Sequence, residues 1–319
     1  MTGHAHRSPR PPGYRRLGLL ALACAACLSA GEAQADPPET TTPESAAPSL
    51  PEVTVEAQRE REQLRRKVDT YVSAAMVHPS DESMSRWDMP ICLLVAGLPA
   101  DRGEFILTRV SAIATQAGAP LDKNAGCHAN FFVVVTAAPD VLLKKWRARD
   151  PAMFNTTRGA GGIDTFLRSS RPVRVWYNAD WGGSTGASPL SMIGGVSASS
   201  TINNAPTTQN YDGGSRLKWS GVRQIESVLV VVDTTRLKDA RIGALADYVA
   251  MVGLADVRLD ADYGPAPTIL RLFSNSQTDR PDALSDWDQA LLRALYTTNQ
   301  QSQMQLSEMR TSVMKTLSP

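Results

Sequence analysis

Histidine is scarce in this sequence of 319 residues, which contains four. Two of them lie within the first six residues, so the rest of the chain contains only His78 and His128. A zinc site built from two or three histidines is therefore almost excluded. We predict no metal site of this kind.

Motifs for nucleotide binding and serine hydrolysis are also missing. The sequence has no G-x-x-x-x-G-K-S/T loop and no G-x-G-x-x-G after a predicted strand. Gly182–Gly186 matches the G-x-S-x-G pattern of a serine nucleophile, but Pro189 and a run of Gly and Ser follow it in place of a helix. No histidine lies downstream to act as the base. We therefore predict no cofactor and no serine hydrolase activity.

The chain lacks an excess of either charge. Its 33 basic and 32 acidic residues nearly cancel, and removal of residues 1–35 would leave 29 basic and 31 acidic residues, a net charge of −2. Such a balance does not attract nucleic acid or anionic lipid. We expect no nucleic-acid partner.

Only one apolar run is long, and it lies near the N-terminus. Leu17–Ala30 has 14 residues, follows two arginines and precedes an Ala-Gln-Ala motif at 33–35, which is typical of a signal peptide. The run is too short to span a bilayer, and no later segment is apolar enough. We predict a signal peptide at 1–35 and a periplasmic or secreted protein without a transmembrane segment. A lipidated Cys24 is the less favoured alternative.

Two of the four cysteines would remain after cleavage. Cys92 and Cys127 stand beside predicted strands, and an oxidising compartment favours a disulfide bond between them. Closing a loop of about 36 residues would stabilise the fold by roughly 3–4 kcal/mol. A catalytic thiol beside His128 is the alternative, although neighbours on an extended chain point to opposite faces.

Residues 36–57 are predicted to form a disordered linker. The part up to Glu52 is rich in Pro, Thr, Glu, Ser and Ala, which cannot fill a core. Val53–Ala57 (VTVEA) resembles the short box by which outer-membrane receptors engage an energising partner. The many alternating strands of a receptor barrel are absent, so a small edge strand or a chance match is the better interpretation.

Residues 58–319 are predicted to form a single α+β domain, with 58–150 and 163–319 as candidate subdomains. Hydrophobic periodicity predicts a mixed β-sheet with packed helices. Strands are expected at Ile91–Ala96, Asn130–Ala137, Val173–Trp181 and Ile225–Asp233, and a short strand or turn at Thr268–Phe273. Helices are expected at Gln58–Met76, Arg102–Gly118, Pro139–Arg149, Ala240–Asp256, Ala283–Tyr296 and Gln303–Leu317. Ser285 and Asp288 should form a capping box.

A long polar stretch at 182–223, dense in Gly, Ser, Thr and Asn, interrupts the predicted domain. Long segments of this kind are often functional. Tyr and Trp near its ends, with Asn and Ser, suit peptide or saccharide surfaces. The predicted ligand-binding residues are Asn178, Trp181, Tyr211 and Trp219, with Trp176 and Tyr177 also considered and core packing favoured for Trp176.

Carboxylates are too numerous for catalytic pairs to be singled out, so a hydrolase that uses carboxylates alone and a calcium site both stay open. The best cation candidate is the group Asp256, Asp260 and Asp262. It lacks the glycine and distal glutamate of an EF-hand loop. A solvated surface is the better interpretation of these three residues.

Ile225–Tyr296 contains a strand, a helix that ends in Gly-Leu, the sequence Ile-Leu-Arg-Leu-Phe and then Asp-x-x-Leu-Leu-Arg-x-Leu-Tyr. This pattern resembles the zincin type of metallopeptidase and a loosely related set of secreted proteobacterial proteins of unknown function. The resemblance implies a zincin-like fold. An ordinary amphipathic core helix that ends at Gly253-Leu254 is the alternative.

The resemblance places no zinc ligands on the helix. With Gly253 on the glycine of H-E-x-x-H-x-x-G-x-x-H, the two helical histidines fall on Ala246 and Ala250, the glutamate on Asp247 and the third ligand on Asp256. Methyl groups cannot bind zinc, and Asp247 has no metal-bound water to activate. The resemblance therefore implies a degenerate scaffold without metallopeptidase activity.

Two hypotheses for function follow. The first is an exported, non-catalytic envelope or binding protein on a degenerate zincin-like scaffold, with a peptide, a saccharide or an envelope protein as its partner. The second is a metal-independent hydrolase of envelope peptide or saccharide that uses Asp247, or Asp180, as acid or base. The surroundings of Asp247 distinguish them, because a carboxylate that opens into a cleft indicates a site and one paired with arginine indicates a structural role.

Overall fold

The computed structural model describes residues 52–79, 83–124, 126–154, 159–182, 222–237, 240–274 and 280–318. The predicted signal peptide, Cys24, residues 36–51 of the predicted linker, Tyr211 and Trp219 lie outside the described residues, and so do the side chains of Asp180 and Trp181. Leu50–Pro319 forms one compact unit.

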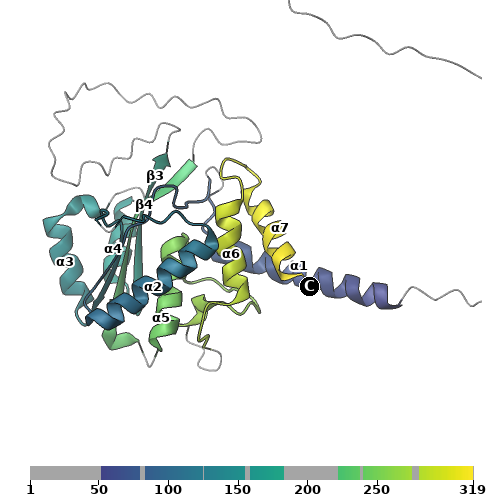
Figure 1. Cartoon of the computed structure of the whole chain (residues 1–319), viewed down its shortest axis with the longest axis horizontal. Helices are drawn as coiled ribbons and strands as arrows, with labels where there is room; N and C mark the ends of the chain where they lie inside the picture. Colours follow the sequence, from purple (N-terminus) through teal and green to yellow (C-terminus); the bar gives the residue numbers. More distant parts are fainter. Residues whose placement is uncertain are drawn as a thin grey trace, which may run out of the picture. The chain divides into compact units, whose positions relative to one another are not determined.

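The fold is α+β, as predicted, with a mixed sheet of four strands and helices packed on both of its faces (Figure 1). The strands are β1 (Leu93–Ala96), β2 (Phe131–Thr136), β3 (Val173–Gly182) and β4 (Val222–Asp233). The α-helices are α1 (Glu52–Ala75), α2 (Ala100–Ala117), α3 (Pro139–Arg149), α4 (Gly159–Arg168), α5 (Ile242–Leu254), α6 (Asp286–Thr297) and α7 (Gln305–Leu317). Short 3-10 helices are η1 (Pro151–Met153), η4 (Thr234–Arg236) and η5 (Ile269–Arg271).

The sheet has the order β1-β2-β4-β3. The first three strands are parallel, and β3 is antiparallel to β4 at one edge. The register pairs Thr136 with Asp233, the last residues of β2 and β4. A parallel sheet covered on both faces needs apolar side chains on both faces of its inner strands. This requirement explains why β4 is nearly continuous in apolar residues and buried from Ile225 to Asp233.

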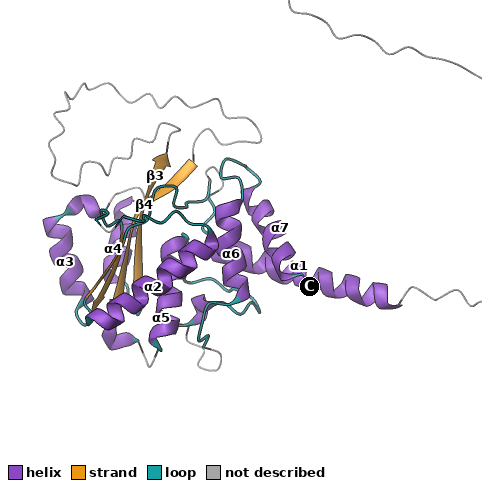
Figure 2. Cartoon of the chain, viewed as in Figure 1, coloured by secondary structure: helices purple, strands orange, loops and turns teal. Residues whose placement is uncertain are grey.

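Successive residues of each strand point to opposite faces and so fill two cores. On β2, Phe131 and Val133 join the larger core, together with α1, α2, α5, α6 and α7, whereas Phe132 and Val134 face the smaller one. The smaller core is covered by α3 and α4, and Trp176 of β3 lies within it. Figure 2 shows the sheet between α3 and α4 on one side and α2 and α5 on the other.

The predicted disulfide bond is confirmed. Cys92 and Cys127, with Cα atoms 5.9 Å apart, join the chain just before β1 to the chain just before β2, and these strands are parallel neighbours. Asn130 strengthens the same end of the sheet, because its Oδ1 accepts from Cys92 N at 2.8 Å and its Nδ2 donates to the Pro90 carbonyl at 3.0 Å. The bond therefore fixes one end of the β1–β2 pair.

Two predictions about local structure are wrong. Val53–Ala57 is helical and not an edge strand, because α1 begins at Glu52. No helix was expected between Pro139–Arg149 and Val173–Trp181, but Gly159–Arg168 forms α4. In α4 the low helix propensity of glycine is overridden by packing, because Ile163 and Phe166 lie in the smaller core. At Thr268–Phe273 the turn alternative holds and the strand does not, because Thr268 caps the 3-10 helix Ile269–Arg271 by accepting from Leu270 N at 3.2 Å.

Helix α5 crosses the sheet closely at Gly253. A Cβ atom at this position would lie 1.8 Å from Cζ of Phe131 on β2, so no larger residue fits without displacing the ring. The helix continues to Leu254 and its C-cap is Ala255. Gly253 is therefore a packing residue in the last turn of α5, and the helix ends at Leu254, as predicted for an ordinary core helix.

The C-terminal helices follow the predicted pattern. Ser285 accepts from the Asp288 backbone and Asp288 accepts from the Ser285 backbone, which is the capping box predicted for α6. Met309 and Val313 of α7 are buried in the larger core. No helix in the described ranges has the length and apolar character needed to cross a membrane.

Candidate functional site

Asp247 on α5 is buried and paired with an arginine. Its carboxylate accepts from Arg109 Nε at 2.5 Å and Nη2 at 2.9 Å, and from the Leu284 backbone N–H at 2.7 Å. The Asp247 side chain is 1% exposed, whereas that of Arg109 is 42% exposed. The hydrogen bonds to Asp247 raise the pKa of the Arg109 guanidinium. These contacts meet the condition set above for a structural role.

Asp288 is a second buried carboxylate and has no exposed surface. Its oxygens accept from Tyr71 Oη at 2.7 Å, Thr268 Oγ1 at 2.5 Å and Ile269 N at 2.8 Å, as well as from Ser285. Burial raises the pKa of the Tyr71 hydroxyl well above its usual value, and the nearby Asp288 raises it further. Asp288 thus joins α1, η5 and α6 and has little capacity left for a ligand.

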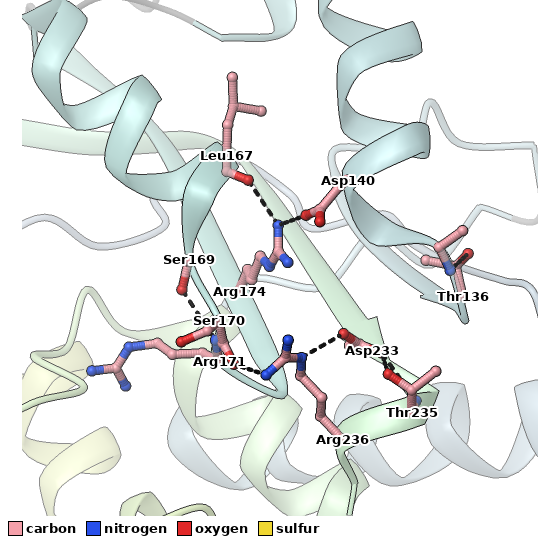
Figure 3. A network of polar contacts seen from close by, with 11 residues as sticks. Thr136, Asp140, Leu167, Ser169, Ser170, Arg171, Arg174, Asp233, Thr235 and Arg236 are labelled. Atoms are coloured by element: carbon pink, nitrogen blue, oxygen red, sulfur yellow. Dashed lines mark hydrogen bonds and ion pairs between the residues drawn. The ribbon is translucent and has the colours of Figure 1, made fainter.

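A third buried carboxylate, Asp233, ends β4 at the carboxyl end of the parallel strands (Figure 3). Its Oδ1 accepts from Thr235 N at 3.0 Å and Thr235 Oγ1 at 2.6 Å, and its Oδ2 accepts from Arg236 Nε at 3.2 Å. Burial acts to raise the pKa of Asp233, but the hydrogen bonds from Thr235 and the charges of Arg236 and Arg174 outweigh it, and the pKa is lowered. Ligands often bind at such strand ends, but this carboxylate already has its donors.

The acidic residues proposed for a cation do not form a metal site. Asp260 is paired with Arg171, and Asp262 accepts from Gly264 N at 3.0 Å. Ala246 and Ala250, which stand where the zincin histidines would be, have no exposed surface. Among the described residues, no group of three His, Cys, Asp or Glu side chains could hold a metal ion.

The predicted contact residues near β3 lie mostly inside the protein. Asn178 is 5% exposed, accepts from Trp176 Nε1 at 2.9 Å and donates to the Met153 carbonyl and Ser227 Oγ at 2.8 and 2.7 Å. Trp176 is a core residue, as expected, and Tyr177 donates to the carbonyl of Val252 at 2.6 Å. These three side chains connect β3 to the cores on the two faces of the sheet, Trp176 and Asn178 to the smaller one and Tyr177 to the larger one.

A groove of about 580 Å³ runs beside β3 and was not predicted. One wall is α4, which contributes Gly162, Thr165 and Phe166, together with Ser169 just after it, and the other wall is the segment Val257–Ala261, with Val77 beside it. Arg171 and the residues Arg174–Tyr177 also line it. Its volume lies within the range of small-ligand sites. We call it the β3 groove.

The β3 groove is lined by three arginines and one aspartate. Arg171 is ion-paired with Asp260 and donates to the Leu259 carbonyl at 3.1 Å. Arg258 is exposed and donates to the Ser73 carbonyl at 3.3 Å, and it has no carboxylate partner among the described residues. The lining therefore has a positive balance, although the mature chain as a whole is predicted to be slightly acidic.

Arg174 is the buried member of this set. Its side chain is 3% exposed, and its Nη1 lies 2.7 Å from Asp140 Oδ1 and donates to the Leu167 carbonyl at 2.9 Å. Figure 3 shows these contacts on the side of the sheet that carries α3 and α4. The buried Nε has no hydrogen-bond partner in the described part of the chain. Because Asp140 is 76% exposed, this cation is only partly compensated.

No sequence signal pointed to the β3 groove. Apart from Val77, its lining comes from two segments far apart in the chain, 162–177 and 257–261. Each arginine, considered alone in the sequence, is typical of a protein surface. The informative pattern would have been the alternation of side chains between the two faces of β3, which places Arg174 on the face toward the smaller core. A charged residue at such a position needs either a partner or a ligand.

Comparisons with known proteins give no match: no family model, no curated protein and no solved structure resembles the chain significantly. The resemblance to zincin metallopeptidases therefore stays a prediction.

Proposed function

We propose that this chain is an exported, non-catalytic binding protein that holds a carboxylate-bearing ligand in the β3 groove. The observation that carries the proposal is the groove itself, which combines a volume of about 580 Å³ with Arg171, Arg174 and Arg258 in its lining. Arginine binds carboxylates through a planar fork of donors. A groove with three of these side chains favours an anionic partner.

Export is supported by two independent features. The Cys92–Cys127 disulfide is of the kind that persists in oxidising compartments. The N-terminal sequence has the charged, apolar and small-residue regions of a signal peptide. We therefore propose a periplasmic or secreted location, with a peptide, a saccharide or an envelope protein as the source of the ligand and a degenerate zincin-like scaffold as the origin of the fold.

The non-catalytic part of the proposal is supported by the state of the carboxylates. Asp247, the residue on which the alternative hydrolase depends, accepts three hydrogen bonds, two of them from Arg109. A general acid or base must reach the substrate with its reacting oxygen. The binding hypothesis is therefore better supported than hydrolysis by Asp247.

The proposal is tested by nuclear magnetic resonance with a blocked Glu-Glu dipeptide as the probe. We expect the largest amide shift changes at Val175 and Arg258, and an affinity about tenfold lower in Arg258→Glu, because one favourable charge becomes a repulsive one. The matched control is Arg102→Glu, an exposed arginine at the start of α2, which should leave the affinity unchanged.

The same preparations test the hydrolase alternative. Wild type and Asp247→Asn are incubated with peptidoglycan and with peptide libraries, and the products are followed by mass spectrometry. We expect no turnover by either protein. Turnover that is lost in Asp247→Asn, or a dipeptide that shifts no amide of the β3 groove, would contradict the proposed function.

A further inference from the structure

Among the described residues, the backbone of β3 is open on the side that faces the β3 groove. In the described part of the sheet β3 is an edge strand whose partner is β4, and Asp233 N donates to the Pro172 carbonyl at 2.8 Å. In an antiparallel pair, hydrogen-bonded and non-hydrogen-bonded positions alternate. The register then directs the N–H and C=O of Arg174 and Trp176 toward β4, and those of Val175 away from it.

Val175 thus presents one donor and one acceptor to the β3 groove, which it lines. No hydrogen bond joins its backbone to another described residue on that side. An exposed strand edge is a template for pairing with another extended chain. The unpaired groups therefore indicate what kind of ligand the groove accepts.

The groove beside β3 has two walls. On one side stands α4, whose Phe166 packs on Trp176 with ring centroids 5.5 Å apart. The other wall, Val257–Ala261, is fixed by bonds to the end of α1 and the chain that follows it: Arg258 N donates to the Ala75 carbonyl at 2.8 Å, and Val77 N donates to the Asp256 carbonyl at 3.1 Å. An extended segment that pairs with β3 between these walls adds one strand width, about 4.8 Å.

The charges select the side chains of that segment. Alternate side chains of a strand paired with β3 would point to the two walls. Arginine lies toward both walls: Arg174 toward α4, and Arg171 and Arg258 toward the opposite segment. The one lining carboxylate, Asp260, is 85% exposed and already paired with Arg171. Acidic side chains on the incoming strand complement this set, and basic ones are repelled.

We propose that the β3 groove binds an extended peptide segment with acidic side chains, which adds to β3 as a fifth strand and pairs with the backbone of Val175. This inference rests on the proposed function and specifies its ligand. Main-chain hydrogen bonds supply affinity in strand addition, and the walls and charges supply selectivity.

The first test uses blocked heptapeptides of sequence Thr-Glu-Val-Glu-Val-Glu-Thr and the full-length mature chain with its disulfide. Two versions are N-methylated, one on odd and one on even positions, so that each removes the amide protons of one edge of the strand. We expect one version to bind like the unmodified peptide and the other to bind at least about tenfold more weakly. Equal binding by both versions would overturn strand addition.

The second test changes the groove. Val175→Pro removes the N–H that faces the groove without removing a donor to β4, and proline is tolerated at such edge positions. We expect about a tenfold loss of peptide affinity, with an unchanged melting temperature as evidence that the fold is intact. The matched control Val175→Thr keeps the N–H and should bind like wild type.

Further outcomes separate the possible failures. If the Glu-Glu dipeptide binds but Val175→Pro leaves heptapeptide affinity intact, the proposed function stands and strand addition is wrong. If neither probe binds, the proposed function fails as well. A Lys-for-Glu heptapeptide that binds equally well would contradict the charge argument. A change of oligomeric state in Val175→Pro, measured by analytical ultracentrifugation, would identify a second copy of the chain as the occupant and overturn the peptide proposal.

Discussion

Two ion pairs in this protein have opposite patterns of burial. In the pair of Asp247 and Arg109 the acid is 1% exposed and the base 42% exposed, whereas in the pair of Arg174 and Asp140 the base is 3% exposed and the acid 76% exposed. Asp247 accepts three hydrogen bonds that occupy both of its oxygens. Arg174 uses one terminal nitrogen for both of its contacts and leaves Nε without a partner among the described residues.

The difference separates a structural charge from one suited to binding. A buried charge is stable when all of its hydrogen-bonding capacity is used. Asp247 fulfils this condition and connects α5 to α2 and to the chain before α6. Arg174 does not, and it lines a groove. Asp247, the catalytic candidate in the sequence, is thus structural in its contacts, whereas Arg174, which the sequence did not single out, is a buried cation whose Nε has no partner among the described residues.

The largest expected effect is that of Asp247→Asn on stability. The substitution removes the charge that Arg109 and the Leu284 N–H bind, and we expect the free energy of unfolding to fall by about 3 kcal/mol. Urea denaturation at neutral pH measures the change. The control is Asp282→Asn in the fully surface-exposed pair with Arg241, which should cost less than about 0.5 kcal/mol. Equal effects of the two substitutions would remove the basis of the comparison.

Arg174→Met should affect binding more than stability. The substitution leaves behind Asp140, which is exposed and can be hydrated, so no buried charge is orphaned. We expect the affinity for the acidic heptapeptide to fall about tenfold while the free energy of unfolding changes by less than about 1 kcal/mol. Calorimetric titration and urea denaturation measure the two quantities. A stability loss as large as that of Asp247→Asn would make Arg174 a structural residue.

The contribution of Asp233 to the free energy of unfolding is expected to depend on pH. Because its pKa is lowered in the folded protein from the ordinary value of 3.8, its contribution to stability is present above that value and is lost as the pH falls through the lowered pKa. We expect Asp233→Ala, which also removes the cap of η4, to cost about 1 kcal/mol at pH 7. The difference from wild type should shrink below pH 4, and a difference that grows on acidification would show that the sign is wrong.

The smallest expected effect is that of Asp140→Asn. This carboxylate is 76% exposed, so its loss should change the free energy of unfolding by less than about 0.5 kcal/mol. Arg174 would lose its competitor for anionic ligands, and the affinity for the acidic heptapeptide should rise about twofold. A fall in affinity would mean that Asp140 positions Arg174 for the ligand.

Much of the fold could be predicted because the strands and helices have strong periodicity. The bounds of α3 matched the prediction, since Pro139 marks its start, and the strand predicted at Ile225–Asp233 is part of β4. Helix α4 was missed because its first turn, Gly159–Gly162, is rich in glycine and has low helix propensity. Its buried Phe166 and Ile163 supply the packing that the propensity does not.

The surroundings of the candidate site could not be predicted because they depend on strand order and long-range contacts. Arg109 and Asp247 are 138 residues apart, and nothing in the sequence of either segment identifies the other. The β3 groove likewise exists only because β3 lies at the edge of the sheet beside Val257–Ala261. Asn178 was assigned to a binding surface from its residue type and proximity to the polar stretch, whereas its contacts are internal.

The first and last helices of the compact unit pack on each other. Arg310 of α7 donates to Ser73 Oγ of α1 at 2.6 Å, and Met309 and Val313 enter the same core as Tyr71. The larger core is therefore incomplete until α7 packs on α1. For a chain exported as proposed, this arrangement delays completion of the fold until α7 has reached the compartment in which the disulfide forms.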